Sequence, residues 1–300
     1  MKHLLSYVAC LFLLMLTWQS SGQVNEGEPD AVDRQPVFAG KFYPKAEGEL
    51  KNTLKDFFAQ AKKKEPGAGV AALIAPHAGY PYSGQVAASA YNQLDPEHRF
   101  DNIFIIAPSH RASFGGASIY HKGDYITPLG NVDVNRKLAY RLIEEHDVFV
   151  FNESAHSKEH SLEVQLPFLQ YHLKKGFQIV PIVTGSQDQA TMKAMAGAME
   201  PYFNENNLFV VSTDFSHYPE YNEAVAVDKA SAAAIVKNSP DELVRILRSN
   251  AEKDVSNLAT SMCGWPGVYA LLNITGNRNN LQVNKIQYKN SGDATGRKDR

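Results

Sequence analysis

Cysteine is scarce in this chain of 300 residues, which contains only Cys10 and Cys263. Because Cys10 lies inside an apolar N-terminal run that we expect to be removed, the mature chain has one thiol and no internal disulfide. A lone exposed thiol is a liability in an oxidising compartment. Cys263 is therefore expected either to be buried and inert or to have a function.

An excess of either charge is also missing. The 30 Lys and Arg residues against 32 Asp and Glu residues give a formal net charge of -2, and no basic stripe is visible. A face that binds nucleic acid normally carries clustered basic residues, so we expect no nucleic-acid partner. The one notable charge run, at residues 62–64, is typical of the solvated end of a helix.

Long hydrophobic runs are limited to the N-terminus. The run at residues 4–18 has about 15 residues, whereas a membrane-spanning helix needs roughly 20. A positive start at Lys2, this apolar centre and small residues at Ser20 and Gly22 predict a secretory signal peptide over residues 1–22. We expect cleavage near Gln23, export to the periplasm or out of the cell, and no stable membrane insertion afterwards; a retained anchor is the alternative.

The rest of the chain alternates between strand-like and helix-like segments. Residues 23–35 are polar without periodicity, which predicts a flexible leader, and residues 36–300 form the expected domain. Apolar runs typical of strands buried on both faces lie at 70–75, 101–107, 177–184 and 207–212. Amphipathic stretches lie at 48–63, 84–94, 133–146, 161–175, 188–203 and 222–237. The pattern predicts one α/β domain, a three-layer α/β/α arrangement with a mostly parallel or mixed central sheet.

Three of the apolar runs are followed by a histidine. "ALIAPHAGYPYSG" leads to His77, "IFIIAPSH" to His110 and "LFVVSTDFSH" to His217. In open α/β sheets, ligands bind beyond the carboxyl ends of the strands. One histidine after a strand is usually a surface or loop residue, but three at the same topological position favour a shared site. Tyr80 and Tyr82, which follow His77, are expected to wall the pocket.

Two further stretches carry candidate residues. In "KEHSLEVQLPFL", His160 and Glu163 lie three residues apart at a predicted helix start. They form either a capped helix end with a solvated edge or a pair that orients a ligand histidine. In "TSMCGWPGVYALL", Cys263 lies just before an apolar helix, where the helix N-terminus is expected to lower the pKa of its thiol.

The strand-end histidines and Cys263 allow two kinds of chemistry. Two histidines and a thiolate would make a three-ligand metal site with room for water or substrate. The same residue types could instead form a Cys–His nucleophilic pair. Asp214 lies three residues before His217, where its carboxylate is predicted to fix the tautomer of that imidazole.

Several of these motifs occur together in one known family. In chain order, "PVFAGKFYP", "APHAGYPYSG", "APSH", "EHSLEVQLPFL", "STDFSHY", "MCGWPG" and "YKNSGDATG" resemble the Memo family, whose bacterial members are often named AmmeMemoRadiSam system protein B. The resemblance covers nearly everything from Pro36 onward. It implies a fold similar to that of class III extradiol dioxygenases. Family members usually continue past "SGDATG" into a last apolar strand, so a final C-terminal strand is expected to be missing here.

The resemblance also implies roles for particular residues. The metal pocket of Memo proteins, which holds iron (Fe²⁺) or copper, maps onto His77, His110 and Cys263; zinc is a further candidate. His217 matches the histidine that dioxygenase relatives use as acid and base. His160 and Glu163 match a motif that lines the pocket.

Three functions follow from these residues. The leading one is a metal-dependent redox protein, an oxidoreductase related to extradiol dioxygenases. Because those enzymes have a carboxylate where this sequence offers the softer, oxidisable Cys263, dioxygenase chemistry does not carry over directly. The alternative implied by the resemblance is a non-catalytic pocket for a small aromatic or anionic ligand, including a phosphotyrosine peptide. A Cys–His hydrolase ranks last, because the sequence has no evident oxyanion motif.

Overall fold

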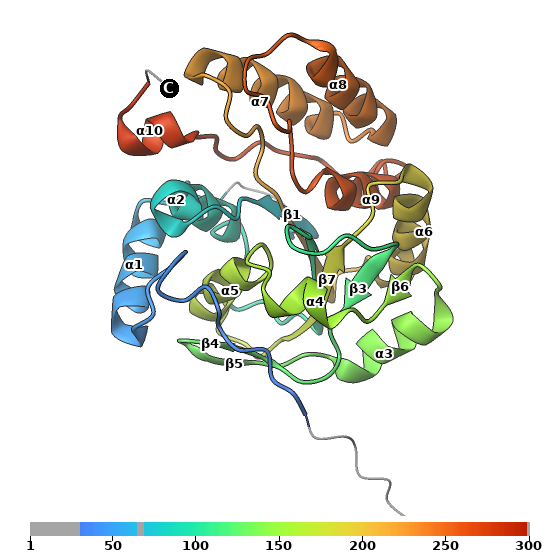
Figure 1. Cartoon of the computed structure of the whole chain (residues 1–300). Helices are drawn as coiled ribbons and strands as arrows, with labels where there is room; N and C mark the ends of the chain where they lie inside the picture. The colour runs from blue at the N-terminus through green and yellow to red at the C-terminus, as the bar shows by residue number, and fades with distance from the viewer. Residues whose placement is uncertain (1–30, 65–68, 299–300) are drawn as a thin grey trace, which may run out of the picture. The chain divides into compact units, whose positions relative to one another are not determined.

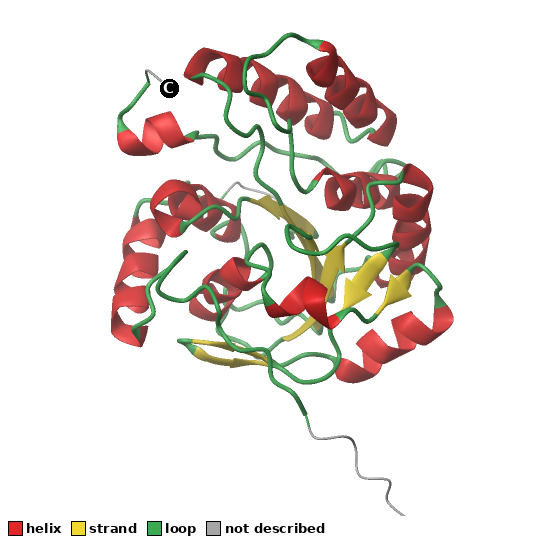
Figure 2. Ribbon diagram, in the orientation of Figure 1, coloured by secondary structure: helices red, strands yellow, loops and turns green. Residues whose placement is uncertain are grey.

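The central feature of the fold is a six-stranded sheet, which Figures 1 and 2 show between groups of helices. The computed structural model describes residues 31–64 and 69–298. The predicted signal peptide and residues 23–30 of the predicted leader lie outside the described residues. Among the helices that are described, none is both long and apolar enough to cross a membrane.

The four predicted strands are confirmed and lie side by side, with β1 at one edge of the sheet. They are β1 (Ala72–Ala75), β2 (Asn102–Pro108), β7 (Gln178–Thr184) and β8 (Asn207–Ser212). The sheet order is β1-β8-β2-β7-β3-β6, and the pairs β1–β8, β2–β8 and β2–β7 are parallel. Their register places the last residues of neighbouring strands side by side, Ala75 with Ser212 and Pro108 with Thr184. The carboxyl ends of these strands therefore share one edge.

The remaining strands are short and were not predicted. β3 (Ala117–Ile119) runs antiparallel to β7, and β6 (Phe149–Val150) runs parallel to β3. β4 (Tyr125–Thr127) and β5 (Gly130–Val132) pair separately as a two-stranded sheet. Runs of two or three residues contain too little pattern to reveal a strand. Because β3 is antiparallel to its neighbour, the sheet is mixed.

Helices cover both faces of the sheet. They are α1 (Glu47–Ala59), α2 (Tyr80–Tyr91), α3 (Arg136–Glu145), α4 (Glu153–Ser157), α5 (Leu166–His172), α6 (Gln189–Met199), α7 (Tyr221–Val236), α8 (Pro240–Glu252), α9 (Trp265–Thr275) and α10 (Ser291–Thr295), with single 3₁₀ turns η1 (Glu163–Gln165) and η2 (Glu200–Tyr202). Along β2, Ile103 and Ile105 enter one core cluster, and Phe104 and Ile106 enter the other. Since alternate residues of a strand face opposite sides, the sheet separates two apolar layers, which confirms the three-layer α/β/α prediction.

Part of the predicted leader is held in place by hydrogen bonds. Residues 31–35 were assigned to a flexible segment, yet the backbone amide of Val32 donates to Lys122 O at 2.9 Å and that of Arg34 donates to Asp124 O at 2.7 Å. Arg34 is only 4% exposed. The polar sequence of this segment did not indicate that Arg34 is buried. Its charge is neutralised by the carboxylate of Glu163, which is distant in sequence.

Candidate metal centre

The candidate site lies at the edge formed by the carboxyl ends of the parallel strands. His77, His110 and Asp214 each come two residues after the end of β1, β2 and β8. Cys263 comes two residues before α9, which packs against β2 and β8. The strand register and the start of α9 thus bring the segments that carry these four residues close together.

The structure brings His77, His110 and Cys263 together. One ligand atom from each of the three side chains lies within 4.8 Å of the other two. The Cys263 Sγ is 3.2 Å from His77 Nε2, and the two imidazole rings meet edge to face with centroids 5.2 Å apart. His77 is almost fully buried, and His110 is partly exposed. The three donors therefore face a common point.

Hydrogen bonds fix the tautomer of His77. Its Nδ1 lies 2.9 Å from Ser212 Oγ, whose single proton is donated to Ser161 O at 2.6 Å. Gln165 Nε2 also donates to Ser212 Oγ at 2.8 Å. Since the serine hydroxyl has no second proton, His77 Nδ1 must carry the hydrogen of this contact. The lone pair of His77 is then on Nε2, which faces Cys263.

A carboxylate fixes the tautomer of His110. Glu159 Oε1 lies 2.9 Å from His110 Nδ1, and Glu159 Oε2 accepts the backbone N–H of His110 at 2.6 Å. Burial raises the pKa of Glu159, but its hydrogen bonds to His110 outweigh this and lower the pKa to about 2. An ionised carboxylate only accepts, so Nδ1 of His110 carries the proton and Nε2 keeps its lone pair. The sequence prediction missed Glu159, although it directly precedes His160.

The Cys263 thiol does not have the lowered pKa that its position before a helix predicted. Burial and the nearby carboxylate of Asp214 raise its pKa to about 12. The lowering of the thiol pKa by the helix N-terminus is outweighed, because α9 begins only at Trp265 and the sulfur is desolvated. Burial also favours the uncharged form of His77, because it lowers the pKa of the imidazole. Cys263 and His77 are therefore a neutral thiol beside a neutral imidazole. This disfavours a Cys–His nucleophile, whereas a bound cation would displace the thiol proton.

The donor set fits a transition metal. Two neutral imidazoles present their Nε2 lone pairs, and one sulfur completes the group. Imidazole and thiolate ligands suit copper, iron and zinc, whereas magnesium and calcium prefer oxygen. Three protein ligands leave a position for water or substrate.

Asp214 does not hold His217 as predicted. Asp214 Oδ1 accepts the backbone N–H groups of His77 at 2.8 Å and Ala78 at 3.2 Å, and Oδ2 lies 3.8 Å from His77 Nε2. The Asp214 carboxylate is thus directed toward the residues that follow β1, not toward His217. His217 is fixed through its backbone, which donates to Thr260 O at 3.0 Å.

The predicted pair His160 and Glu163 divides into two different roles. The His160 ring stacks on His110 with centroids 4.6 Å apart, and burial with the neighbouring His77 lowers its pKa to about 4. His160 Nδ1 lies 3.2 Å from a Glu159 oxygen without the geometry of a hydrogen bond. Glu163 is fully buried and bonds to Arg34, not to a ligand histidine, because the first turn points its side chain toward the N-terminal segment.

Tyr80 and Tyr82 do not wall the site. Tyr80 is buried in the core and donates to Val164 O at 2.9 Å, whereas Tyr82 is 51% exposed. The helix α2 already begins at Tyr80, so the two residues project from different faces of a helix. Neither is among the residues that line the cavity beside His110 and Cys263.

The cavity beside His110 and Cys263 has a volume of about 220 Å³. Its wall contains His110, Cys263 and His217, together with hydroxyl and amide side chains from Ser109, Thr184, Ser186, Gln187 and Thr260. None of the described residues that line it is a lysine or arginine. The walls therefore suit a small polar molecule better than a highly charged anion.

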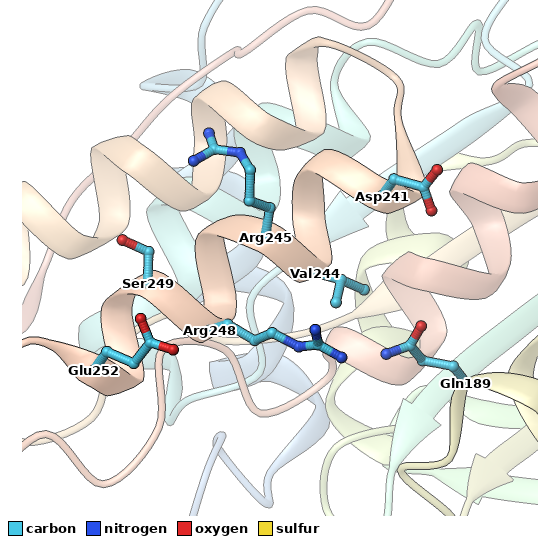
Figure 3. A pocket seen from close by; sticks show the side chains of 7 residues that line it. All are labelled: Gln189, Asp241, Val244, Arg245, Arg248, Ser249 and Glu252. Carbon is cyan, nitrogen blue, oxygen red and sulfur yellow. The ribbon is translucent and has the colours of Figure 1, made fainter.

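A larger cavity of about 500 Å³ lies along α8 and the start of α6, as Figure 3 shows. Arg248 points toward Gln189 across this cavity in Figure 3, and Arg245 is already paired with Glu242. The described residues that line it include no histidine or cysteine. It is separate from the set of metal donors.

The close approach of Gly264 to β8 should position Cys263. A Cβ at Gly264 would lie 2.5 Å from Ser212 O and 2.6 Å from Thr213 Cβ. We expect Gly264→Ala to lower the free energy of unfolding by about 1–3 kcal/mol, because β8 and α9 must separate. Metal affinity should fall several-fold with it. Urea denaturation and metal titration measure both effects.

Gly197→Ala in α6 is the matched control, since nothing lies within 4 Å of its added methyl group. Alanine favours a helix over glycine by about 1 kcal/mol, so this variant should be at least as stable as the wild type. Equal stability of the two variants would contradict the prediction for Gly264.

The family model and the related proteins that match this chain point to the same family. The family model described as "Memo-like protein" matches residues 34–300. A MEMO1 family protein of Methanosarcina mazei is 34% identical over 270 residues, covering 89% of this chain and 95% of the relative. MEMO1 family protein Ta0237 of Thermoplasma acidophilum is 33% identical over 265 residues, covering 88% of this chain and 94% of the relative.

Among solved structures, the uncharacterized protein JW3007 from Escherichia coli K12 has a TM-score of 0.42 and 14% identity, covering 61% of this chain and 78% of that chain. This likeness is too weak to inform function. The family model and the relatives at about one-third identity are sufficient: the chain belongs to the Memo family.

Proposed function

We propose that this protein is a metal-dependent redox protein in which His77, His110 and Cys263 hold iron (Fe²⁺) or copper. The observation that carries the proposal is the convergence of three donor atoms within 4.8 Å of one another. Each imidazole is held by a partner that leaves Nε2 free for a metal. Zinc would fit the same donors, but it would not supply redox chemistry.

The chain's own residues have separate tasks in this proposal. When bound, iron or copper would supply Lewis acidity and one-electron chemistry. Ser212 and Glu159 hold the ligand imidazoles in the required tautomers. His217 lines the same cavity and can move a proton to or from a bound molecule. The hydroxyl and amide groups of the wall orient a small polar substrate, and an aromatic diol fits that description.

The cavity wall favours this proposal over a phosphopeptide-binding pocket. A phosphate ester carries nearly two negative charges and is usually bound by arginine or lysine. The described wall of the cavity supplies neither, so an anionic ligand would depend on the metal for its charge partner. Non-catalytic binding remains the alternative that the following experiment addresses.

Elemental analysis of protein purified without oxygen tests the metal directly. We expect about one iron or copper ion per chain, since one three-ligand group with an open position holds one ion. Oxygen consumption should then be measured with catechols, before and after removal of the metal by a chelator. Zinc alone would contradict the redox proposal, and a metal-free protein that binds no added metal would contradict the metal centre itself.

A further inference from the structure

We infer that Arg34 is a positioning residue of the metal centre: it fixes a loop, residues 158–162, that orients both ligand histidines. This inference rests on the proposed metal centre. It concerns an arginine of the N-terminal segment that is itself neither one of the three proposed metal ligands nor part of the cavity wall. Four steps connect Arg34 to the imidazoles.

The first step is that one loop serves both histidines. Glu159 accepts from the backbone N–H and faces the Nδ1 of His110. Two residues later, Ser161 O accepts from Ser212 Oγ at 2.6 Å, and the same hydroxyl accepts from His77 Nδ1. A shift of this loop would therefore change both imidazoles together.

The second step is that the loop has little regular structure of its own. It lies between the end of α4 at Ser157 and the start of η1 at Glu163. Ser161 Oγ ties it to Pro108 O at 2.8 Å, on the side of the sheet. On the side away from the sheet, the loop is held by hydrogen bonds from a residue outside it.

The third step is that Arg34 supplies this support. Its Nε donates to His156 O at 3.1 Å, its Nη2 donates to Glu159 O at 2.8 Å, and its Nη1 bonds to Glu163 Oε2. The guanidinium thus joins the residues on both sides of the loop and one residue within it. A planar guanidinium directs its donors at fixed angles, so these three points are held in one geometry.

The fourth step is that the ion pair is buried and its other contacts are complete. Glu163 Oε1 also accepts the backbone N–H of Phe38 at 2.9 Å and the hydroxyl of Tyr43 at 2.6 Å. Removing Arg34 alone would leave the Glu163 carboxylate buried without its partner, which is strongly destabilising for the whole fold. A clean test must therefore remove both charges or keep both.

Two variants of the full chain meet this condition. Arg34→Met combined with Glu163→Gln removes both charges and keeps an oxygen for Phe38 and Tyr43. Arg34→Lys keeps the charge pair, but an ammonium cannot reproduce the guanidinium's three directions. Circular dichroism and thermal melting establish that each variant is folded.

The probe is Co²⁺, whose absorption bands report on the geometry and on the sulfur ligand of the bound ion. We expect the double variant to bind Co²⁺ about 10–100-fold more weakly than the wild type, as is usual when groups behind metal ligands are lost. Its bands should also shift in position or intensity. Arg34→Lys should show a change in the same direction, smaller than that of the double variant.

The matched control is Leu142→Ala, which truncates a buried side chain in α3, a helix that packs on β3, β6 and β7. It should lower the melting temperature without changing Co²⁺ affinity or bands. A wild-type protein that does not bind Co²⁺ would overturn the metal centre and this inference together. Wild-type affinity and bands in both Arg34 variants would overturn the positioning role alone.

Discussion

Substituting Cys263 by alanine is expected to weaken metal binding by roughly 100-fold or more while leaving the fold intact. Structural zinc sites with four ligands bind with about 10–16 kcal/mol, so one ligand contributes roughly 3 kcal/mol, which corresponds to about 100-fold. Cys263 is the only one of the three ligands that carries a negative charge when bound. Competition with a chromophoric chelator under anaerobic conditions measures the affinity.

The fold should survive this change because the sulfur makes few structural contacts. The backbone amide of Asp214 donates to Sγ at 3.3 Å, and the side chain borders the cavity. Cys263→Ser is the first control, since it keeps the size but replaces a soft ligand by a poor one; it should lose nearly as much affinity. His98→Ala, which removes an exposed histidine, should retain wild-type affinity.

Cys263→Ala also distinguishes between two groups of side chains that could bind the ion. Among the described residues, His110, Glu159 and His160 also place one donor atom each within 4.8 Å of one another. In that group, however, Glu159 already accepts hydrogen bonds from His110, His160 and Ser161. Unchanged affinity in Cys263→Ala would show that the ion is held by this second group, and the assignment of Cys263 would be wrong.

The sequence predicted which elements meet at the site better than it predicted their contacts. Strands buried on both faces have a strong apolar pattern, and their carboxyl ends share an edge in a parallel sheet, so His77 and His110 could be placed without coordinates. These placements are consequences of chain direction and periodicity. For Cys263 the pattern indicated only a position before an apolar helix, and the resemblance to the Memo family supplied its place beside the two histidines.

Contacts that depend on loop shape were beyond the sequence pattern. Glu159 and Glu163 are both glutamates beside the same histidine, and only the loop conformation decides that Glu159 meets His110 while Glu163 meets Arg34. The raised pKa of Cys263 has a similar origin. Position along a helix is visible in the sequence, whereas desolvation by segments distant in sequence is not.

His217→Ala is expected to leave metal affinity nearly unchanged and to reduce any oxygen-dependent turnover by about 10²–10⁴-fold, the usual contribution of general acid–base catalysis. Within the described part of the chain, His217 belongs to neither group of side chains close enough to share an ion. Its imidazole nevertheless lines the cavity beside His110 and Cys263. Metal titration and oxygen consumption measured on the same preparation separate the two effects.

The backbone of His217 explains why this side chain can act without being a ligand. The residue pairs with the segment before Cys263, donating to Thr260 O at 3.0 Å and accepting from the amide of Ala259 at 3.2 Å. The Asp214 carboxylate is directed to the backbone of His77 and Ala78, so it does not tie up the His217 side chain, and His217 lines the cavity.

His217→Gln is the matched control for this prediction, because an amide keeps polarity and hydrogen bonding but cannot exchange a proton near neutral pH. If His217 transfers a proton, the glutamine variant should be about as slow as the alanine variant. If it only orients the substrate, glutamine should restore much of the rate. Loss of metal in either variant would show that His217 is a ligand, since a proton-transfer residue outside the donor group has no reason to change the affinity.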